Sequence, residues 1–428
     1  MTRQYGRRVA ILGGNRIPFA RANGPYARVS NQDMLTTALE GLAHRFGLAG
    51  EQVGEVVGGA VLKHANDHNL TRESVLGTSL APTTPAFDVQ QACATSLQAT
   101  VLVANKIALG QIDSAIAAGT DSASDAPLAV SQGLGQAFVQ MGRARSNVDR
   151  ARVVAGLRPT DLVPVPTRAV EPRTGLSMGQ HMAATAQDWG ITREAQDRLA
   201  VESHQRLAAA YDRGFFDDLI TPYLGLTRDG SLRPQTSLEK LGALPTVFGK
   251  GTGATMTAGN STPLTDGASA VLLGSEEWAA AHGLTPLAWF VDAQAAAVDY
   301  VHGREGMLMA PVYALPPLLA RTGLALGDFD LVEVHEAFAA TVLATLAAWE
   351  SPTFCRDRLG LSGPLGKVDR SRLNVNGSSL AAGHPYAATG GRVVATLAKE
   401  LHQLGSGYGL ISVCAAGGQG MVAILEAA

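Results

Sequence analysis

Short apolar runs that alternate with amphipathic helical segments constrain the fold of this chain more than any other feature. In the first part, residues 8–12, 53–61 and 114–121 have the apolar composition of buried strands. The helix expected over residues 31–46 presents one apolar stripe, made of Met34, Leu35, Ala38, Leu39 and Leu42. Strands that alternate with helices of this length predict a mixed α/β sheet covered by helices on both faces.

The same order of elements returns in the second part of the chain. We expect strands at residues 287–293 and 331–334, helices at 313–322, 336–349 and 390–404, and two last strands at 408–414 and 421–426. A chain of 428 residues is too long for one ordinary hydrophobic core. We therefore predict a duplicated α/β unit, with one half at residues 1–121 plus 256–275 and the other at 276–428.

Residues 122–255 have a different character, with scattered prolines and one clear amphipathic helix. That helix is expected over residues 192–214, with Thr192 as its N-cap and Gly214 as its stop. We predict an inserted loop domain here. Its arginines outnumber its acids Asp149, Asp161 and Glu171, and they are Arg143, Arg145, Arg150, Arg152, Arg158, Arg168 and Arg173. Two interpretations stay open: a solvated basic face, or a surface for phosphates or an acidic partner.

Composition excludes several classes of protein. The formal charge of -3 argues against general nucleic-acid binding. The chain has three cysteines, Cys93, Cys355 and Cys414, which lie far apart. Their odd number does not indicate a disulfide framework, and their spacing does not indicate a metal site. Reduced thiols favour a reducing, cytoplasmic location. No run approaches the roughly 18 apolar residues of a membrane span. The apolar run after Arg7 and Arg8 is too short for an export signal, so it is read as the first strand.

One turn of the first half carries a reactive residue type. An extended run at residues 85–89 leads to Cys93, and an almost unbroken apolar helical pattern follows at 97–109. A thiol at the N-terminus of a helix faces the positive end of the helix dipole, which predicts a lowered pKa. The alternative is a buried structural cysteine.

Three later turns also deliver polar groups at a helix start or among glycines. They lie at residues 332–339 with His335, at 374–390 with His384, and at 411–420 with Cys414. Either histidine alone is compatible with a purely structural role. Gly383 and Pro385 flank His384, and because they allow close backbone approach and fix the turn, they favour a histidine that points into a site.

Taken together, these turns resemble those of the thiolases, and the resemblance covers essentially the whole chain. The matching motifs are the Cys93 turn, Thr257–Ser261 with Asp266–Ala268, His335–Phe338, Gly383–Pro385 and Cys414–Gly418. The resemblance implies a five-layered αβαβα fold. Many thiolases carry asparagine at the place of His335 and isoleucine-glycine at the place of Tyr386-Ala387. In these positions the chain looks like the β-subunit of the trifunctional complex of fatty-acid oxidation.

The family resemblance also implies roles for these residues. Cys93 would attack a 3-ketoacyl-CoA and keep the shortened acyl chain as a thioester, while His384 takes the thiol proton. Acetyl-CoA would leave as an enolate that Cys414 protonates. Coenzyme A would then release the acyl group, so it is a co-substrate, and no bound cofactor is expected.

Oxyanion sites and substrate contacts are implied in the same way. His384 and a water held by His335 would bind the enolate oxygen, and the backbone N–H groups of Cys93 and Ala416 would form a second oxyanion hole. Many thiolases have glycine at the place of Ala416. Histidine in place of asparagine at 335 introduces a titratable group, so a different pH dependence is expected. Ser261, Met178 and Phe338 match positions near the acyl and pantetheine groups, although packing or turn formation explains each equally well.

The prediction that the resemblance supports is a degradative 3-ketoacyl-CoA thiolase in the cytoplasm. Its alternatives are a biosynthetic acetyl-CoA acetyltransferase with the same residues and a non-catalytic assembly subunit of the same fold. Ketosynthases share the fold but have no cysteine at the place of Cys414, which argues against them. A homodimer or larger assembly is expected, and branch resemblance adds a hydratase/dehydrogenase α-subunit as a possible partner.

Overall fold

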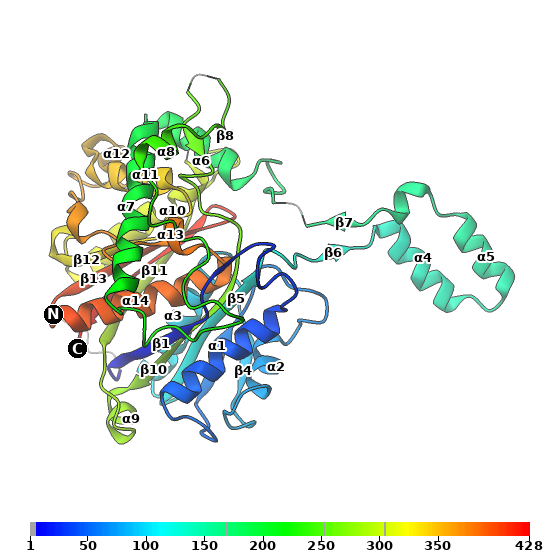
Figure 1. Cartoon of the computed structure of the whole chain (residues 1–428), viewed down its shortest axis with the longest axis horizontal. Coiled ribbons are helices and arrows are strands. Elements are labelled where there is room, and N and C mark those ends of the chain that lie inside the picture. Colours follow the sequence, from blue (N-terminus) through cyan, green and yellow to red (C-terminus); the bar gives the residue numbers. More distant parts are fainter. Residues whose placement is uncertain (1–5, 168, 252, 304) are drawn as a thin grey trace.

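The structure is a computed structural model that describes residues 6–167, 169–251, 253–303 and 305–428 (Figure 1). Arg168 of the basic run and residues 1–5 of the predicted first half lie outside the described residues. Within these ranges, no helix is both long and apolar enough to cross a membrane.

The chain contains one α/β unit twice. The first unit runs through β1 (Val9–Arg16), α1 (Asn31–Arg45), β3 (Glu55–Gly58), α3 (Thr95–Ala108), β5 (Ser114–Ser122) and β10 (Thr265–Ser275). The second runs through β11 (Ala288–Ala297), α10 (Ala310–Thr322), β12 (Phe329–Val334), α14 (Thr389–Leu404), β13 (Tyr408–Ala415) and β14 (Gln419–Ala427). In both, the second and third strands pair in parallel and the fourth pairs antiparallel with the third and the first. The predicted duplication is confirmed.

The strands form one path in the order β12-β13-β14-β11-β1-β10-β5-β3-β4, with β4 at Ala86–Asp88 and β2 (Ala20–Arg21) paired to β10. The two units meet where β1 pairs with β11, and this pairing covers only Ala10 with Trp289 and Ile11 with Ala288. Because the junction is so short, the two halves of the sheet can pack on opposite sides of α3 and α14.

Alternating strand residues show the layers directly. Val271 of β10 and Val413 of β13 share one central core with α3 and α14. Leu272, the next residue of β10, lies in an outer core with α1. Leu410 of β13 lies in the other outer core, with α10 and α11 (Ala339–Glu350). Since side chains alternate between the faces of a strand, these three cores give the five-layered order α-β-α-β-α that the resemblance implied.

Local signals explain the helices whose ends were predicted well. Ser30 caps α1, and with Asp33 it forms a capping box in which each side chain accepts from the backbone of the other. Thr192 is the N-cap of α7 (Arg193–Asp212), as predicted. The helix ends just before Gly214, whose φ of 75° favours glycine.

The helix predicted over residues 336–349 begins later than expected, because α11 starts at Ala339. Phe338 has the extended backbone of an N-cap. The buried Glu336 carboxylate accepts a hydrogen bond from the Ser203 hydroxyl at 2.7 Å. Such contacts across the fold, which helical periodicity does not reveal, hold the segment before α11 in a loop.

The expectation of a single helix within residues 122–255 was wrong. The structure has α4 (Gln132–Arg143), α5 (Asn147–Ala155), α6 (Met178–Asp188) and α8 (Leu238–Gly242) in addition to α7. Glycines weaken the helical pattern of α4, and α5 buries none of its residues, so it shows no apolar stripe. Short elements complete the chain: α2 (Leu70–Leu76), α9 (Glu276–Ala281), α12 (Pro352–Asp357), α13 (Ser379–Ala382), β8 (Thr246–Phe248) and β9 (Met256–Thr257).

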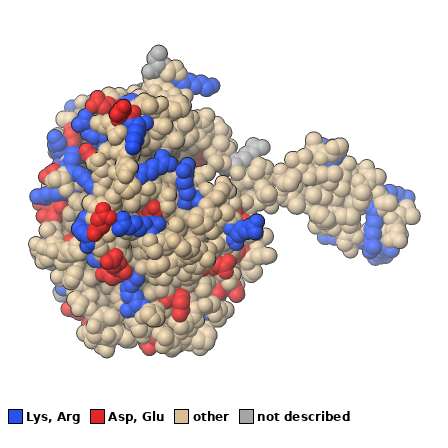
Figure 2. Space-filling model, viewed as in Figure 1, with Lys and Arg blue, Asp and Glu red and all other residues tan. Residues whose placement is uncertain are grey.

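Part of the inserted segment forms an arm that extends away from the body (Figure 1). The paired strands β6 (Leu128–Ala129) and β7 (Val165–Pro166) lead out to α4 and α5. Basic side chains gather at the far end of the arm (Figure 2). The arm also exposes large apolar side chains, which are Leu128, Val130, Phe138, Val139, Val148, Val154, Leu162, Val163 and Val165. The arm is therefore a surface of mixed basic and apolar character.

Candidate active site

A strained turn delivers Cys93 at the start of α3. Ala92 has a φ of 45°, a left-handed conformation that a residue other than glycine rarely adopts. The Thr95 hydroxyl donates to the Ala92 carbonyl at 2.7 Å and accepts from the Gln91 N–H at 2.9 Å, which fixes the turn. Backbone strain held by such contacts is typical of active sites. The thiol therefore lies at the strand-to-helix turn that the sequence predicts.

His384 faces this thiol. Its Nε2 lies 3.1 Å from Cys93 Sγ, and its Nδ1 lies 2.5 Å from the Thr389 hydroxyl at the start of α14. Gly383 has a φ of 99°, and a Cβ at this position would lie 2.7 Å from Thr265 Cγ2. Only glycine permits this turn, which places a buried imidazole against a buried thiol. The geometry is that of a nucleophile and its base.

The predicted lowering of the thiol pKa is wrong for the free enzyme. Burial raises the pKa of Cys93 from 9.0 to about 12, although the backbone N–H groups of Ala416 and Cys93 act in the opposite direction. Burial also lowers the pKa of His384 to about 3, and the charge of Arg392 adds to this. A helix dipole contributes about 0.3–1 kcal/mol, whereas three pKa units correspond to about 4 kcal/mol. The resting pair is therefore a neutral thiol and a neutral imidazole.

This neutral pair makes a prediction for alkylation. The thiolate fraction of a thiol with a raised pKa grows with pH and does not level off before that pKa. We therefore expect the rate of iodoacetamide inactivation to rise steadily from about pH 6 to about pH 10. Peptide mapping should place the label on Cys93. A plateau near neutral pH would reveal a preformed thiolate–imidazolium pair. Preferential labelling of Cys355, which is fully buried, would contradict Cys93 as the reactive thiol.

His335 lies beside His384 at the end of β12. The ring centroids of the two histidines are 4.2 Å apart. Its Nδ1 lies 2.8 Å from the Ser379 hydroxyl, and its buried Nε2 has no hydrogen-bond partner among the described residues. Burial, and then the charges of His384 and Arg392, hold the pKa of His335 well below its usual range. The expected change in pH dependence therefore does not arise from His335, which is neutral at physiological pH.

Cys414 lies at the end of β13, buried in the outer core with α10 and α11. Burial raises the pKa of its thiol, and a negative charge on Cys93 would raise it further. The strand turns back through Gly417 and Gly418, both with positive φ. The turn also brings the Ala416 N–H to Cys93 Sγ. Cys414 is therefore a protonated thiol close to the Cys93–His384 pair.

The three remaining predicted residues lie around the second unit. The backbone of Ser261 pairs with that of Phe338, and the Ser261 hydroxyl donates to the Thr257 carbonyl at 2.7 Å. The Phe338 ring packs against Phe248 with a centroid separation of 5.9 Å. Met178 begins α6 and packs against the same outer core. The structure thus gives Ser261 and Phe338 structural contacts of their own.

Several residues of the site were missed by the sequence analysis. Thr389 contacts the base His384, and Ser379 contacts His335. Asp121, at the end of β5, accepts from the Ala387 N–H at 2.8 Å and so ties the His384 turn to the first unit. Glu171 accepts from the Gly417 N–H in the Cys414 turn. An acidic residue in an otherwise apolar strand was the available signal for Asp121, because such residues are rarely buried without a specific partner.

The chain matches two family models along almost its full length. They are described as the thiolase N-terminal domain, at residues 9–277, and the thiolase C-terminal domain, at residues 284–427.

Individual proteins agree with these matches. The 3-ketoacyl-CoA thiolase of Pectobacterium atrosepticum is 42% identical over 427 residues, which cover 98% of this chain and 97% of the relative. The solved structure of human mitochondrial 3-ketoacyl-CoA thiolase in complex with CoA is 29% identical, with a TM-score of 0.80 and coverage of 99% and 98%. The acetyl-CoA acetyltransferase of Bacillus anthracis is 28% identical, with a TM-score of 0.81 and coverage of 99% and 100%. This chain belongs to the thiolase family.

Proposed function

We propose that the chain is a 3-ketoacyl-CoA thiolase, an acetyl-CoA C-acyltransferase. It cleaves a 3-ketoacyl-CoA with coenzyme A to give acetyl-CoA and an acyl-CoA shortened by two carbons, the reaction used in fatty-acid oxidation. The observation that carries the proposal is the 3.1 Å contact between the Cys93 thiol and neutral His384, next to a second buried thiol, Cys414. Cys93 can form the acyl-enzyme, His384 can take and return the thiol proton, and Cys414 can protonate the leaving enolate.

Acylation starts from the neutral pair. Cys93 Sγ attacks the keto carbon as His384 Nε2 takes its proton, so the thiolate forms only when the substrate is in place. The alkoxide that results is bound by the backbone N–H groups of Cys93 and Ala416. The bond between the α-carbon and the keto carbon then breaks. Its electrons enter the enolate of acetyl-CoA, while the shortened chain stays on Cys93 as a thioester.

Cys414 completes the first half of the reaction. The enolate oxygen accepts hydrogen bonds from protonated His384 and from His335, directly or through a water. A thiol with a raised pKa keeps its proton until a strong base such as the enolate carbon forms next to it. Proton transfer to this carbon releases acetyl-CoA and leaves Cys414 as a thiolate.

Deacylation restores all three groups. The Cys414 thiolate takes the proton of an incoming coenzyme A, whose sulfur attacks the thioester on Cys93. The Cys93 thiolate then leaves and recovers its proton from His384. Each proton that one group releases is taken up by another, so Cys93, His384 and Cys414 end the cycle in the protonation states in which they began it.

Substrate binding extends this proposal to the inserted segment. We assign residues 122–255 to an inserted domain. The first half then comprises residues 1–121 and 256–275, and the second half comprises residues 276–428. Met178, Phe338 and Ser261 would lie along the acyl and pantetheine groups. The support for this assignment is the apolar packing of Met178 and Phe338 on one core at the edge of the second unit.

Assays of thiolysis test the proposed function. Purified protein should cleave short, medium or long 3-ketoacyl-CoAs in the presence of coenzyme A, measured as loss of the 3-ketoacyl-CoA absorbance. Activity confined to acetoacetyl-CoA would favour the alternative of a biosynthetic acetyl-CoA acetyltransferase. The absence of turnover at every chain length would overturn the proposed function and favour a non-catalytic assembly subunit.

The arm supports a proposal about partners. A cytoplasmic homodimer or larger assembly would bind a hydratase/dehydrogenase α-subunit, with the arm as a contact surface because it combines exposed apolar and basic residues. Since Leu128 pairs with Pro166, a short glycine linker can replace the segment between them. We expect this deletion to keep thiolysis and to abolish co-purification with the α-subunit. Purification of the native protein as a lone homo-oligomer would contradict the partnership.

A further inference from the structure

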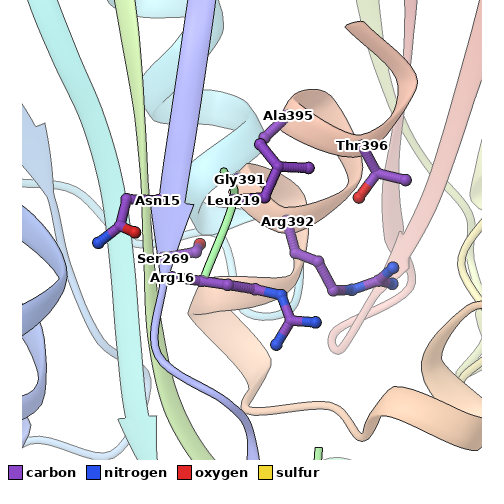
Figure 3. Close-up of a pocket in the computed structure, with 8 residues that line it drawn as sticks. All are labelled: Asn15, Arg16, Leu219, Ser269, Gly391, Arg392, Ala395 and Thr396. Atoms are coloured by element: carbon purple, nitrogen blue, oxygen red, sulfur yellow. The ribbon is translucent and has the colours of Figure 1, made fainter. Parts of the chain in front are cut away.

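A chain of hydrogen bonds leads from a buried arginine to His335. Arg392, on α14, donates from Nη2 to the Ser379 hydroxyl at 2.9 Å, and this hydroxyl lies 2.8 Å from His335 Nδ1. Figure 3 shows the Arg392 side chain extending from α14 next to Arg16, beside a cavity of about 10 Å³. Such a volume holds at most about one water molecule. Arg392 therefore has little room to leave its position.

Donor and acceptor chemistry fixes the direction of this chain. An arginine can only donate, so the Ser379 oxygen is an acceptor toward Arg392. The serine hydroxyl has one proton, and within the described part of the chain its acceptor at hydrogen-bond distance is His335 Nδ1. A proton on Nδ1 would leave the buried Ser379 hydroxyl proton without an acceptor, so the arrangement favours the neutral imidazole that carries its proton on Nε2.

His335 Nε2 is the last atom of this hydrogen-bonded chain and the one that can contact an oxygen in the site. It is buried, and it has no hydrogen-bond partner among the described residues. The adjacent ring is that of His384, which contacts the nucleophile. A buried donor without a partner costs free energy unless a ligand or water accepts its hydrogen bond. The position of Nε2 thus matches a donor that is kept for an oxygen in the site.

We propose that Arg392 and Ser379 are positioning residues that hold His335 as its Nε2–H tautomer, a fixed donor to the enolate oxygen or its bound water. This inference rests on the proposed function. As negative charge develops on the oxygen, the positive charge of Arg392 polarises the chain through Ser379 and strengthens the last hydrogen bond. The chain thus supplies transition-state stabilisation from a charge that does not itself touch the substrate.

Two matched serine variants test the relay. Ser379→Ala removes the link to His335, and we expect kcat to fall about tenfold to a hundredfold, with little change in KM for coenzyme A. This loss is smaller than the roughly 10²–10³ for removal of an oxyanion donor itself. Ser379→Thr should restore most of the loss. Ser378→Ala is the control, because Ser378 also accepts from Arg392 Nη2, at 3.1 Å, but is not hydrogen-bonded to His335. Its kcat should stay close to that of the wild type.

The tautomer is measured independently by ¹⁵N NMR of histidine-labelled wild-type protein, with His335→Asn to assign the signals. The relay predicts a protonated Nε2 and an unprotonated Nδ1. Equal kcat values for Ser379→Ala and Ser378→Ala, or a proton on Nδ1, would overturn the inference. If Ser379→Ala fails to fold, the wild-type tautomer alone decides. Loss of wild-type thiolysis would instead overturn the proposed function, and the NMR result does not depend on turnover.

Discussion

Replacement of Cys93 by serine should reduce kcat for thiolysis by at least about 10⁴-fold, as expected when a covalent nucleophile is removed. A serine hydroxyl is similar in size, so the strained turn at Ala92 and the contact with His384 are retained. The hydroxyl loses its proton far less readily than a thiol, and neutral His384 is a weak base because its pKa is lowered to about 3. Binding of coenzyme A, measured by calorimetry, should change little.

Cys355 provides the matched control for this variant. It is fully buried, and its thiol donates to the Ala348 carbonyl at 3.4 Å, a contact that a serine can reproduce. Cys355→Ser should therefore keep kcat near the wild-type value. Wild-type turnover in Cys93→Ser would remove Cys93 from the mechanism.

Loss of Cys414 should separate two activities that the wild type combines. In Cys414→Ala, no thiol protonates the enolate, so kcat for thiolysis should fall by about 10²–10⁴-fold, the usual contribution of a general acid. Cys93 and His384 remain in contact in this variant. Exchange of labelled coenzyme A into acetyl-CoA forms no enolate. His384 can pass the Cys93 proton to the departing coenzyme A thiolate and take it back, so this exchange should lose much less.

Hydrogen–deuterium exchange at the α-carbon of acetyl-CoA completes this test. The wild type should exchange these protons with D₂O, and Cys414→Ala should not. If thioester exchange and thiolysis fall equally in Cys414→Ala, the variant has damaged the shared Cys93 site, and the assignment of Cys414 as the separate proton carrier fails.

The sequence predicts well the elements that have strong local signals. The helix at α1 has a capping box and a regular apolar stripe, and β5 is a continuous apolar run, so the expected positions of both agree with the structure. The turns of Cys93, His384 and Cys414 were also found, because glycine, proline and reactive residues at the end of a strand are local features. The duplication followed from the order of these elements.

Interactions between distant segments account for what the sequence did not reveal. The pKa of Cys93 depends on burial beneath turns almost three hundred residues away, and this outweighs the local helix dipole. The contacts of Ser379 and Arg392 with the site form only where α14 packs against the loop after β12, and neither residue forms a motif on its own. Glycines interrupt the helical pattern of α4, although Leu134, Phe138 and Met141 lie at helical spacing. The helix α5 buries none of its residues, so neither helix of the arm is clear from the sequence.

Transfer of the acyl group to Cys93 is the step on which the whole mechanism depends. It is tested most directly by mixing the wild-type enzyme with a 3-ketoacyl-CoA in the absence of coenzyme A, quenching with acid and mapping the peptides by mass spectrometry. We expect the mass of the shortened acyl chain on the peptide that contains Cys93, and loss of this mass when coenzyme A is added before the quench. An acyl group on the Cys414 peptide, or thiolysis at full rate with no acylated peptide, would contradict it.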